Sequence, residues 1–311
     1  MNNAIEIKNL CKNYPAFNLK NVNITLPKGY IMGFIGANGA GKSTTISSLL
    51  GLVNTDGGVC LIDGKEMRYM NKAEKAQVGV VLDECNFPEV LNWKQVDKFM
   101  KKIYSTWDSE SFSDRCKNWG LPEKTIVSKY SKGMKMKLAI AAAMCHGAKL
   151  LILDEATRGL DPVVRSEILD MLMEFVQNEE HSVFISSHII SDLEKICDYI
   201  TFIKNGEIIF TAEKDSLTEK YGILRCSNSD FEAVDKNAVI AYNRNSFAVD
   251  ALVDRSKISG DYIIDKASVE DIMLGTWNSW ASRNPSASPT DARKRSSAAT
   301  ACAWPRSRFS G

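Results

Sequence analysis

The sequence lacks the marks of a secreted, metal-binding or membrane-spanning chain. Its eight cysteines include no C-x-x-C pair and none has a histidine at metal-ligand spacing, which predicts free thiols in a reducing cytoplasm. The first residues show no signal peptide. The most apolar stretch, residues 138–153, is interrupted by His146, Gly147 and Lys149 and is too short to span a bilayer. Any association with a membrane is therefore expected to come through a partner.

A marked excess of charge of either sign is also missing. With 39 basic and 38 acidic residues the formal net charge is +1, whereas a dedicated nucleic-acid binder is usually strongly basic. Hydrophobic residues make up 44% of the chain and charged residues 25%, which is ordinary for a globular protein. The 311 residues leave room for one large domain with additions or for two domains, and no internal repeat is visible.

A phosphate-binding loop is present at residues 36–44. Its pattern is G-x-x-x-x-G-K-S, between an apolar run at 30–35 that is typical of a buried strand and a predicted helix at 44–52. The glycines let backbone N–H groups surround phosphates beside the positive end of that helix. Lys42 is expected to reach the β- and γ-phosphates, and the Ser43 hydroxyl to hold Mg²⁺. The residues expected to contact the nucleotide here are Asn38, Gly39, Ala40, Gly41, Lys42, Ser43 and Thr44.

A second part of the site is expected where an apolar strand at 150–153 ends in two carboxylates, Asp154 and Glu155. Asp154 is placed to support Mg²⁺ directly or through water, as in other P-loop enzymes. Glu155 can orient an attacking water or act as its general base, a contribution of about 10²–10⁴-fold in rate. Two solvated acids at a strand end would look the same in isolation, but the preceding phosphate-binding loop favours a catalytic pair.

Three weaker segments accompany these two. Ser131 and Gly133 begin a helical segment and can present a hydroxyl and backbone N–H groups to an anion, although an ordinary helix cap would look similar. The run Gly-Leu-Asp-Pro at 159–162 follows shortly after the two carboxylates. His188 follows a strand-like run, and the carboxyl end of a strand in an α/β sheet lies on the ligand-binding edge. A lone histidine is usually structural, but this position favours a contact with the γ-phosphate.

The spacing of apolar runs predicts an α/β domain for residues 1–220. Asn205-Gly206 between two such runs predicts a hairpin. Residues 92–144 have a helical, lysine-rich pattern, which predicts a helical subdomain inserted at about 86–145. The expected strands, apart from the one before the phosphate-binding loop, are at 5–7, 22–26, 59–62, 78–82, 150–153, 183–185, 200–203 and 208–210.

Two further parts are expected after the α/β domain. Residues 221–275 show mixed alternation and predict a small α+β extension, which we expect to stabilise contacts between two subunits. Residues 276–311 are rich in Ser, Ala, Arg and Pro without any period, which predicts disorder. This tail is either a basic segment for a membrane surface or, because the composition breaks abruptly, an end that is not native to the protein.

In this order and spacing the segments resemble the ATP-binding cassette, the nucleotide-binding subunit of ABC transporters, over residues 1 to about 220. The resemblance implies a P-loop NTPase fold with a mixed central sheet, an N-terminal antiparallel β subdomain and the inserted helical subdomain. Tyr14 falls where that family has an aromatic residue that stacks on adenine, although Tyr14 before Pro15 is also compatible with a plain turn. The correspondences are Walker A at 36–44, the signature at 130–134, Walker B at 150–155, the D-loop at 159–162 and the switch histidine at His188.

The resemblance also implies a mechanism and partners. Two cassettes pair head to tail around two ATP molecules with Mg²⁺, so that Ser131 and Gly133 of one face Walker A of the other. The pair is a homodimer or a heterodimer with a second cassette. Hydrolysis of ATP drives a separate integral-membrane permease, which holds the ATPase at the inner face of the cell membrane. The form of the signature is similar to that of bacterial exporters of peptides, antibiotics or lipids.

The sequence departs from the family pattern at three positions. Asp83 stands where the family has a glutamine that binds Mg²⁺ and faces the membrane partner; it keeps an oxygen ligand but adds negative charge. Lys132 places a cation in the signature, and Arg158 replaces a small residue before the D-loop. Of these three departures, Asp83 suggests one alternative, a cassette with regulatory ATP binding and little turnover.

A cassette that acts on ribosomes or DNA is the other alternative. A translation-factor cassette usually has two copies in one chain, and a DNA-repair cassette has a long coiled coil between Walker A and the signature. This sequence shows only one cassette. The interval at 45–129 is too short for a long coiled coil and shows no sustained heptads. The near-neutral charge also disfavours nucleic acid.

Overall fold

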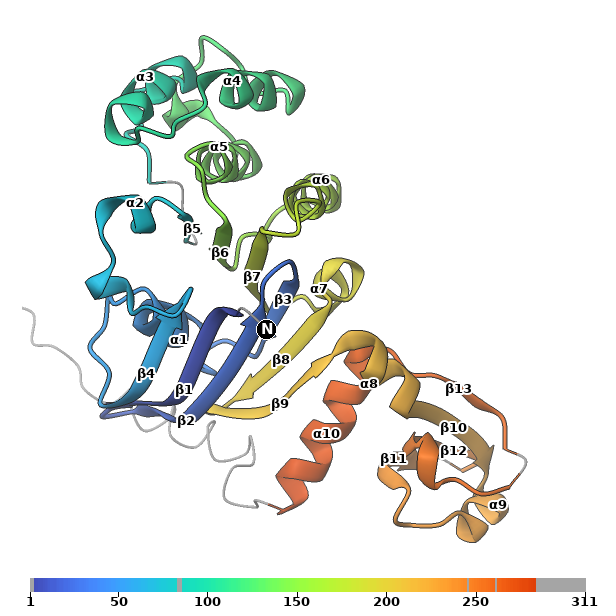
Figure 1. Cartoon of the computed structure of the whole chain (residues 1–311). Helices are drawn as coiled ribbons and strands as arrows, with labels where there is room; N and C mark the ends of the chain where they lie inside the picture. The colour runs from blue at the N-terminus through green and yellow to red at the C-terminus, as the bar shows by residue number, and fades with distance from the viewer. Residues whose placement is uncertain (1–2, 83–85, 245, 261, 284–311) are drawn as a thin grey trace, which may run out of the picture. The chain divides into compact units, whose positions relative to one another are not determined.

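The computed structural model of the chain describes residues 3–82, 86–244, 246–260 and 262–283, with side chains as far as Thr276 (Figure 1). Contacts within the chain divide it into two compact units, the first ending at Ser216 and the second beginning at Leu217. Most of the tail expected at 276–311 lies outside the described residues. Among the described residues, no helix is both long and apolar enough to cross a membrane.

A six-stranded sheet is the centre of the first unit, with the order β5-β6-β7-β3-β8-β9. The first five strands are parallel and β9 is antiparallel to β8. The strands β3, β6 and β7 are buried along their whole length, as expected for strands covered on both faces. The bounds are β3 Ile31–Ile35, β5 Val78–Val81, β6 Leu150–Asp154, β7 Ser182–Ser187, β8 Tyr199–Lys204 and β9 Glu207–Glu213.

A three-stranded antiparallel sheet, β2-β1-β4, forms the N-terminal subdomain. Its strands are β1 Asn3–Tyr14, β2 Phe17–Pro27 and β4 Gly57–Ile62. A single apolar core joins this sheet to the six-stranded sheet and to helix α1 (Lys42–Leu49), which packs against both β4 and β6. This core includes Ile7, Ile24, Phe34, Ile46 and Ile152. The expected mixed central sheet and N-terminal antiparallel subdomain are confirmed.

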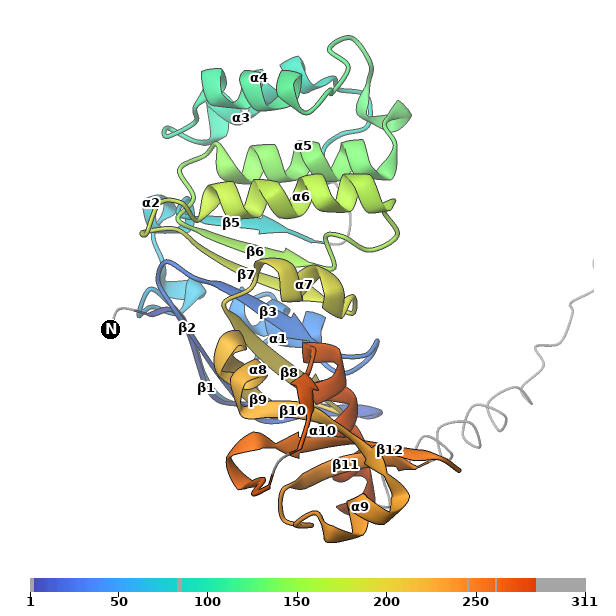
Figure 2. The same ribbon diagram turned by 90° about the vertical axis from the view of Figure 1, so that its right-hand side faces the viewer.

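The inserted helical subdomain contains α3 (Trp93–Ile103), α4 (Ser109–Asn118) and α5 (Lys132–Met144) around a core of its own that includes Trp93 and Phe112. Helix α5 runs beside α6 (Pro162–Phe175), as Figure 2 shows. The approach is close, because a Cβ atom placed on Gly133 would lie 2.7 Å from Val164 Cγ1. The shorter elements of this unit are η1 Met67–Tyr69, α2 Lys72–Lys75, η2 Val127–Lys129 and α7 Ile190–Ile196.

The second unit is a small α+β body with its own apolar core. Its four strands are all antiparallel, in the order β11-β12-β10-β13. Leu224, Phe231 and Val249 are among its buried core residues. Helix α8 (Lys214–Lys220) crosses the boundary between the units. The remaining elements are β10 Tyr221–Ser227, α9 Asn228–Ala233, β11 Val239–Arg244, β12 Ala248–Asp254, η3 Arg255–Lys257, β13 Ile264–Lys266 and α10 Val269–Arg283.

Candidate active site at the phosphate-binding loop

The phosphate-binding loop lies between the end of β3 and the start of α1. Gly41 has φ 114°, and a Cβ atom at this position would lie 2.6 Å from Leu19 Cδ2, so only glycine is compatible with the turn. The back of the loop is fixed by the turn between β8 and β9, where Gly206 N–H donates to the Ala40 carbonyl at 3.0 Å. The carbonyl of Gly206 in turn accepts from Lys20 N–H on β2 at 2.8 Å. The loop is therefore held by strands of both sheets.

Lys42, the first residue of α1, points into the loop and is only 5% exposed. Its ammonium group donates to the carbonyl oxygen of Gly36 at 2.7 Å and to that of Ala37 at 3.3 Å. Its Nζ atom also forms an ion pair with Glu155 Oε1 at 3.0 Å. A buried charge must be compensated by partners of this kind. The loop carbonyls and Glu155 thus position the lysine for an anion.

The two carboxylates lie where β6 ends, beside β7. Parallel pairing places Asp154 opposite Ser186, whose hydroxyl donates to Asp154 Oδ1. The same hydroxyl oxygen accepts from the Glu155 backbone N–H at 3.1 Å. Glu155 has φ 54°, a left-handed conformation that is uncommon outside glycine and that turns the chain sharply at the strand end. Ser186 therefore holds Asp154 by its side chain and Glu155 by its backbone N–H.

His188 completes a chain of three side chains with Lys42 and Glu155. Its Nδ1–H donates to Glu155 Oε2 at 2.5 Å, and the ring is partly exposed. Burial disfavours the ionised form of Glu155, but the interactions with Lys42 and His188 outweigh burial and lower its pKa below the ordinary value. The carboxylate is therefore held ionised between two hydrogen-bond donors. A carboxylate in this state can accept a proton from water.

Lys42, Asp154 and Glu155 line a cleft of about 490 Å³, which is within the range of small-molecule sites. Its ten lining residues are Phe17, Asn38, Gly39, Gly41, Lys42, Ser43, Thr44, Asp154, Glu155 and Arg158. Asp154 and Ser43 both offer oxygen atoms, the ligands that Mg²⁺ prefers, and this ion usually takes only one or two protein ligands besides phosphate and water. The described residues contain no group of three or more His, Cys, Asp or Glu side chains arranged to hold a metal ion.

The comparisons with known proteins point to one family. The profile of the ABC transporter family matches residues 19–158. The lantibiotic transport ATP-binding protein SrtF of Streptococcus pyogenes is 36% identical over 215 residues, which cover 68% of this chain and 91% of that protein. The bacitracin transport ATP-binding protein BcrA of Bacillus licheniformis is 30% identical, and the matched residues cover 80% of this chain and 81% of BcrA. The chain is an ABC transporter ATP-binding subunit.

A solved structure agrees with this assignment. The CbiO1 subunit from Clostridium perfringens, part of the ABC transporter complex cbiONQ, superposes with a TM-score of 0.61 at 26% identity, covering 71% of this chain and 92% of that one. An ATP-binding subunit of another ABC transporter gives a TM-score of 0.60, also at 26% identity, over 70% and 92% of the two chains. The protein is accordingly an ABC-type ATPase with the P-loop NTPase fold.

The structure brings most of the predicted site residues of this ABC ATPase together. Asn38, Gly39, Gly41, Lys42, Ser43 and Thr44 line the cleft with Asp154 and Glu155. Ala40 lies in the loop behind it, and His188 reaches the site through Glu155. Asp83 lies outside the described residues, so its expected contact with Mg²⁺ stays a prediction.

Besides Ala40 and His188, three further predicted residues do not line this cleft. Ser131 caps the N-terminus of α5, where its hydroxyl accepts from Met134 N–H at 3.2 Å, and it is exposed. Gly133 packs against α6. Tyr14 is 39% exposed, and Lys12 Nζ lies 5.4 Å from the centre of its ring. One ABC ATPase chain thus leaves its signature residues outside its own phosphate-binding cleft.

Two lining residues were not predicted as site residues. Phe17 opens β2 and packs against the loop, since its Cζ atom would lie 2.8 Å from a Cβ atom on Gly41. Arg158 follows Glu155 on the same turn, and its N–H donates to the Glu155 carbonyl at 3.0 Å. Two features of the sequence could have indicated these residues. Phe17 is an aromatic residue three positions after Tyr14, and Arg158 is a charged residue where the family has a small one.

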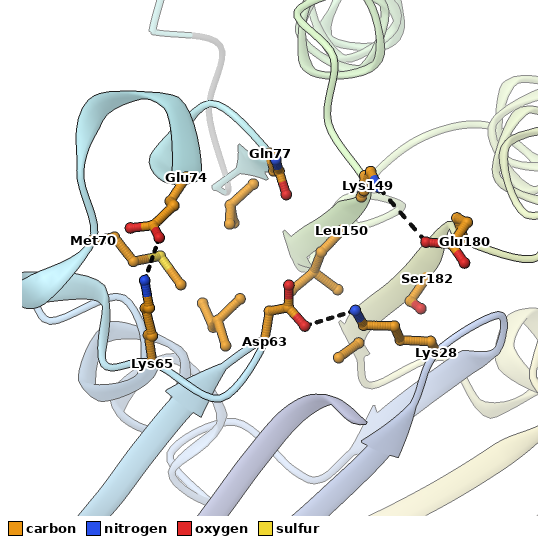
Figure 3. A pocket seen from close by; sticks show the side chains of 13 residues that line it. Lys28, Asp63, Lys65, Met70, Glu74, Gln77, Lys149, Leu150, Glu180 and Ser182 are labelled. Carbon is orange, nitrogen blue, oxygen red and sulfur yellow. Dashed lines mark hydrogen bonds and ion pairs between the residues drawn. The ribbon is translucent and has the colours of Figure 1, made fainter. Parts of the chain in front are cut away.

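A second cavity of about 210 Å³ lies at the opposite edge of the sheet (Figure 3). It is lined by the first residues of β5, β6 and β7, whereas the phosphate-binding loop follows the carboxyl end of β3. Its floor is apolar, and Ile62, Met70 and Leu150 contribute to it. Three ion pairs cross its rim in Figure 3: Lys28 with Asp63, Lys65 with Glu74, and Lys149 with Glu180. This cavity is separate from the nucleotide cleft.

Proposed function

We propose that this ABC ATPase hydrolyses ATP at the cleft with Lys42, Glu155 and His188 as its catalytic groups. The observation that carries the proposal is the continuous contact from Lys42 through Glu155 to His188 beside the loop. When ATP binds, Lys42 leaves its ion pair with Glu155 and contacts the β- and γ-phosphates instead. Ser43 and Asp154 would hold Mg²⁺, which would supply compensation of charge on the phosphate oxygens.

Glu155 then acts on the attacking water. Its carboxylate orients the water or accepts its proton, while His188 holds that carboxylate and contacts the γ-phosphate. For the adenine base, both Tyr14 and Phe17 are candidates, and the position of Phe17 in the cleft lining favours Phe17. The contribution of the protein is mainly positioning and compensation of charge.

The proposal includes a head-to-tail homodimer that closes around two ATP molecules. Ser131 and Gly133 lie outside the cleft of their own chain, so a second copy is needed to bring a signature to each nucleotide. Identical chains meet this need in a symmetric pair. A second, different cassette as the partner is the competing assembly.

The membrane partner is proposed to be a separate integral-membrane permease, which holds the ATPase at the inner face of the cell membrane. A cavity of about 350 Å³ lies between the helical subdomain and β5, lined in part by Val81, Leu82, Phe87 and Tyr104. Leu82 directly precedes Asp83 in the sequence, the position at which the family has a residue facing the membrane partner. Since relatives are described as lantibiotic and bacitracin transport proteins, export of a peptide-like antibiotic is the proposed task.

The test is Mg²⁺-dependent ATP hydrolysis as a function of protein concentration, comparing the natural chain with Glu155→Gln. We expect activity that rises more steeply than linearly and a variant with turnover lower by about 10²–10⁴-fold. The variant should still bind ATP and then dimerise, as size-exclusion chromatography with light scattering can measure.

Two outcomes would count against the proposal. Activity strictly proportional to concentration, with no ATP-dependent dimer of the variant, would reject the homodimer and favour a second cassette. Undiminished turnover in Glu155→Gln would reject the assigned role of the carboxylate.

A further inference from the structure

Arg158 places a second cationic side chain in the nucleotide cleft. Of the ten lining residues only Lys42 and Arg158 are basic, and Asp154 and Glu155 are acidic. The side chain of Lys42 is buried, whereas that of Arg158 is exposed. A nucleoside triphosphate is polyanionic, so the charge of Arg158 favours its binding.

The position of Arg158 indicates which phosphates of the bound nucleotide lie nearest to it. Its backbone N–H donates to the Glu155 carbonyl, and this hydrogen bond closes a turn that links the two residues. Glu155 pairs with Lys42, so the turn lies at the end of the cleft where the terminal phosphates are expected. Phe17 lines the same cleft and packs against Gly41 of the loop.

We propose that Arg158 binds the γ-phosphate of ATP in its own chain and so lets the ATPase distinguish ATP from ADP. The inference rests on the proposed function of the cleft. A guanidinium group is planar, is always charged and can donate two parallel hydrogen bonds to phosphate oxygens. Loss of the γ-phosphate on hydrolysis removes this contact, so the product is held less tightly than the substrate.

The test compares binding of two fluorescent nucleotides to the full chain: a methylanthraniloyl derivative of a non-hydrolysable ATP analogue, and the corresponding ADP. Arg158→Ala should weaken binding of the ATP analogue about 10- to 100-fold, the range of a charge-assisted contact, and change ADP binding less than twofold. Arg158→Lys should be intermediate, because it restores charge without the planar pair of donors.

Arg68→Ala is the matched control. Arg68 is an exposed arginine on η1 that does not line this cleft, so its replacement should alter neither affinity. Unchanged ADP binding also shows that Arg158→Ala is folded at the site.

Equal weakening of both nucleotides by Arg158→Ala, or no weakening, would overturn the inference. A loss seen only when the protein is dimeric would overturn the assignment to the same chain. If the natural chain binds neither nucleotide, the proposed function fails as well, and this result is distinct from the other two.

Discussion

At the scale of single residues, Glu155 is the most constrained side chain of the site. It is 7% exposed, has a left-handed backbone conformation and contacts two potential cations. Burial pushes its pKa up, and Lys42 and His188 push it down by more, so the pKa lies below the ordinary value of 4.5. A group with a lowered pKa in the folded state stabilises the fold above its unfolded pKa and loses that contribution as the pH falls.

The resulting pH dependence is testable by urea unfolding of the natural chain and Glu155→Gln. The natural chain should lose part of its stability as the pH falls below about 4.5, because the unfolded Glu155 then binds a proton while the folded carboxylate, with its lower pKa, is still ionised. Glutamine does not titrate, so the stability difference between the two proteins should shrink toward low pH. Parallel pH curves would show that Glu155 has the same pKa in the folded and unfolded chain.

The two phosphate-site motifs could be predicted at the residue scale, but the full lining of the cleft could not. Lys42, Asp154 and Glu155 were predictable because short motifs fix their spacing to a strand end or helix start. Phe17 and Arg158 were not, because their place depends on how β2 crosses behind the loop and how the turn after β6 closes. These are tertiary relations that no local pattern encodes.

At the scale of elements, the contact between α5 and α6 links the signature to the D-loop. Gly133 lies in the first turn of α5. Val164 lies in the first turn of α6, the helix that begins directly after Asp161. Asp161 caps α6, with its Oδ1 accepting from Val163 and Val164 N–H at 3.1 Å. The absence of a side chain at Gly133 therefore serves helix packing in addition to any role toward nucleotide.

A double-mutant cycle at this contact separates the two roles. Gly133→Ala should destabilise the chain by about 1–3 kcal/mol, because its Cβ atom would overlap Val164. In a Val164→Ala background the same change should cost at least about 0.5 kcal/mol less. Thermal or urea unfolding of the four proteins measures the coupling.

Two results of this cycle would distinguish the two roles of Gly133. Additive effects on stability would mean that Gly133 and Val164 do not compete for space. Restored stability without restored ATPase activity in the double variant would support a direct nucleotide role for Gly133.

The order of strands marks the limit of what local patterns predict for elements. The apolar runs predicted each strand of the six-stranded sheet, and Asn205-Gly206 predicted the hairpin of β8 and β9, whose two turn residues have φ 48° and 79°. The neighbours of β3 in the sheet are β7 and β8, which are more than a hundred residues away in sequence. The position of β3 between these strands could not be predicted from local patterns, since pairing at such separations has no local signal.

At the scale of the whole molecule, the chain consists of two units with separate apolar cores. The nucleotide cleft is built entirely from the first unit. Separate cores allow each unit to unfold without the other. We therefore expect the second unit to be dispensable for nucleotide binding by one chain, whatever its role in contacts between subunits.

A core substitution in the second unit tests this independence. Leu224→Ala removes a fully buried side chain and should destabilise that unit by about 2–5 kcal/mol. Limited proteolysis should then cut the chain after residue 217, while affinity for fluorescent ADP changes less than twofold. Ile152→Ala, in the core beneath the cleft, is the comparison that should weaken both folding and binding. Loss of ADP binding in Leu224→Ala would show that the two units are coupled.

The turn at Asn205-Gly206 has a consequence for how tightly ATP is bound. Gly206 ties the phosphate-binding loop to β2 through two backbone hydrogen bonds, and a Cβ atom there would lie 1.8 Å from the Asn18 carbonyl oxygen. A loop already held in one conformation loses little conformational entropy when phosphates arrive. More of the interaction energy then appears as affinity, so a hairpin that touches no substrate helps to set the nucleotide concentration at which the ATPase responds.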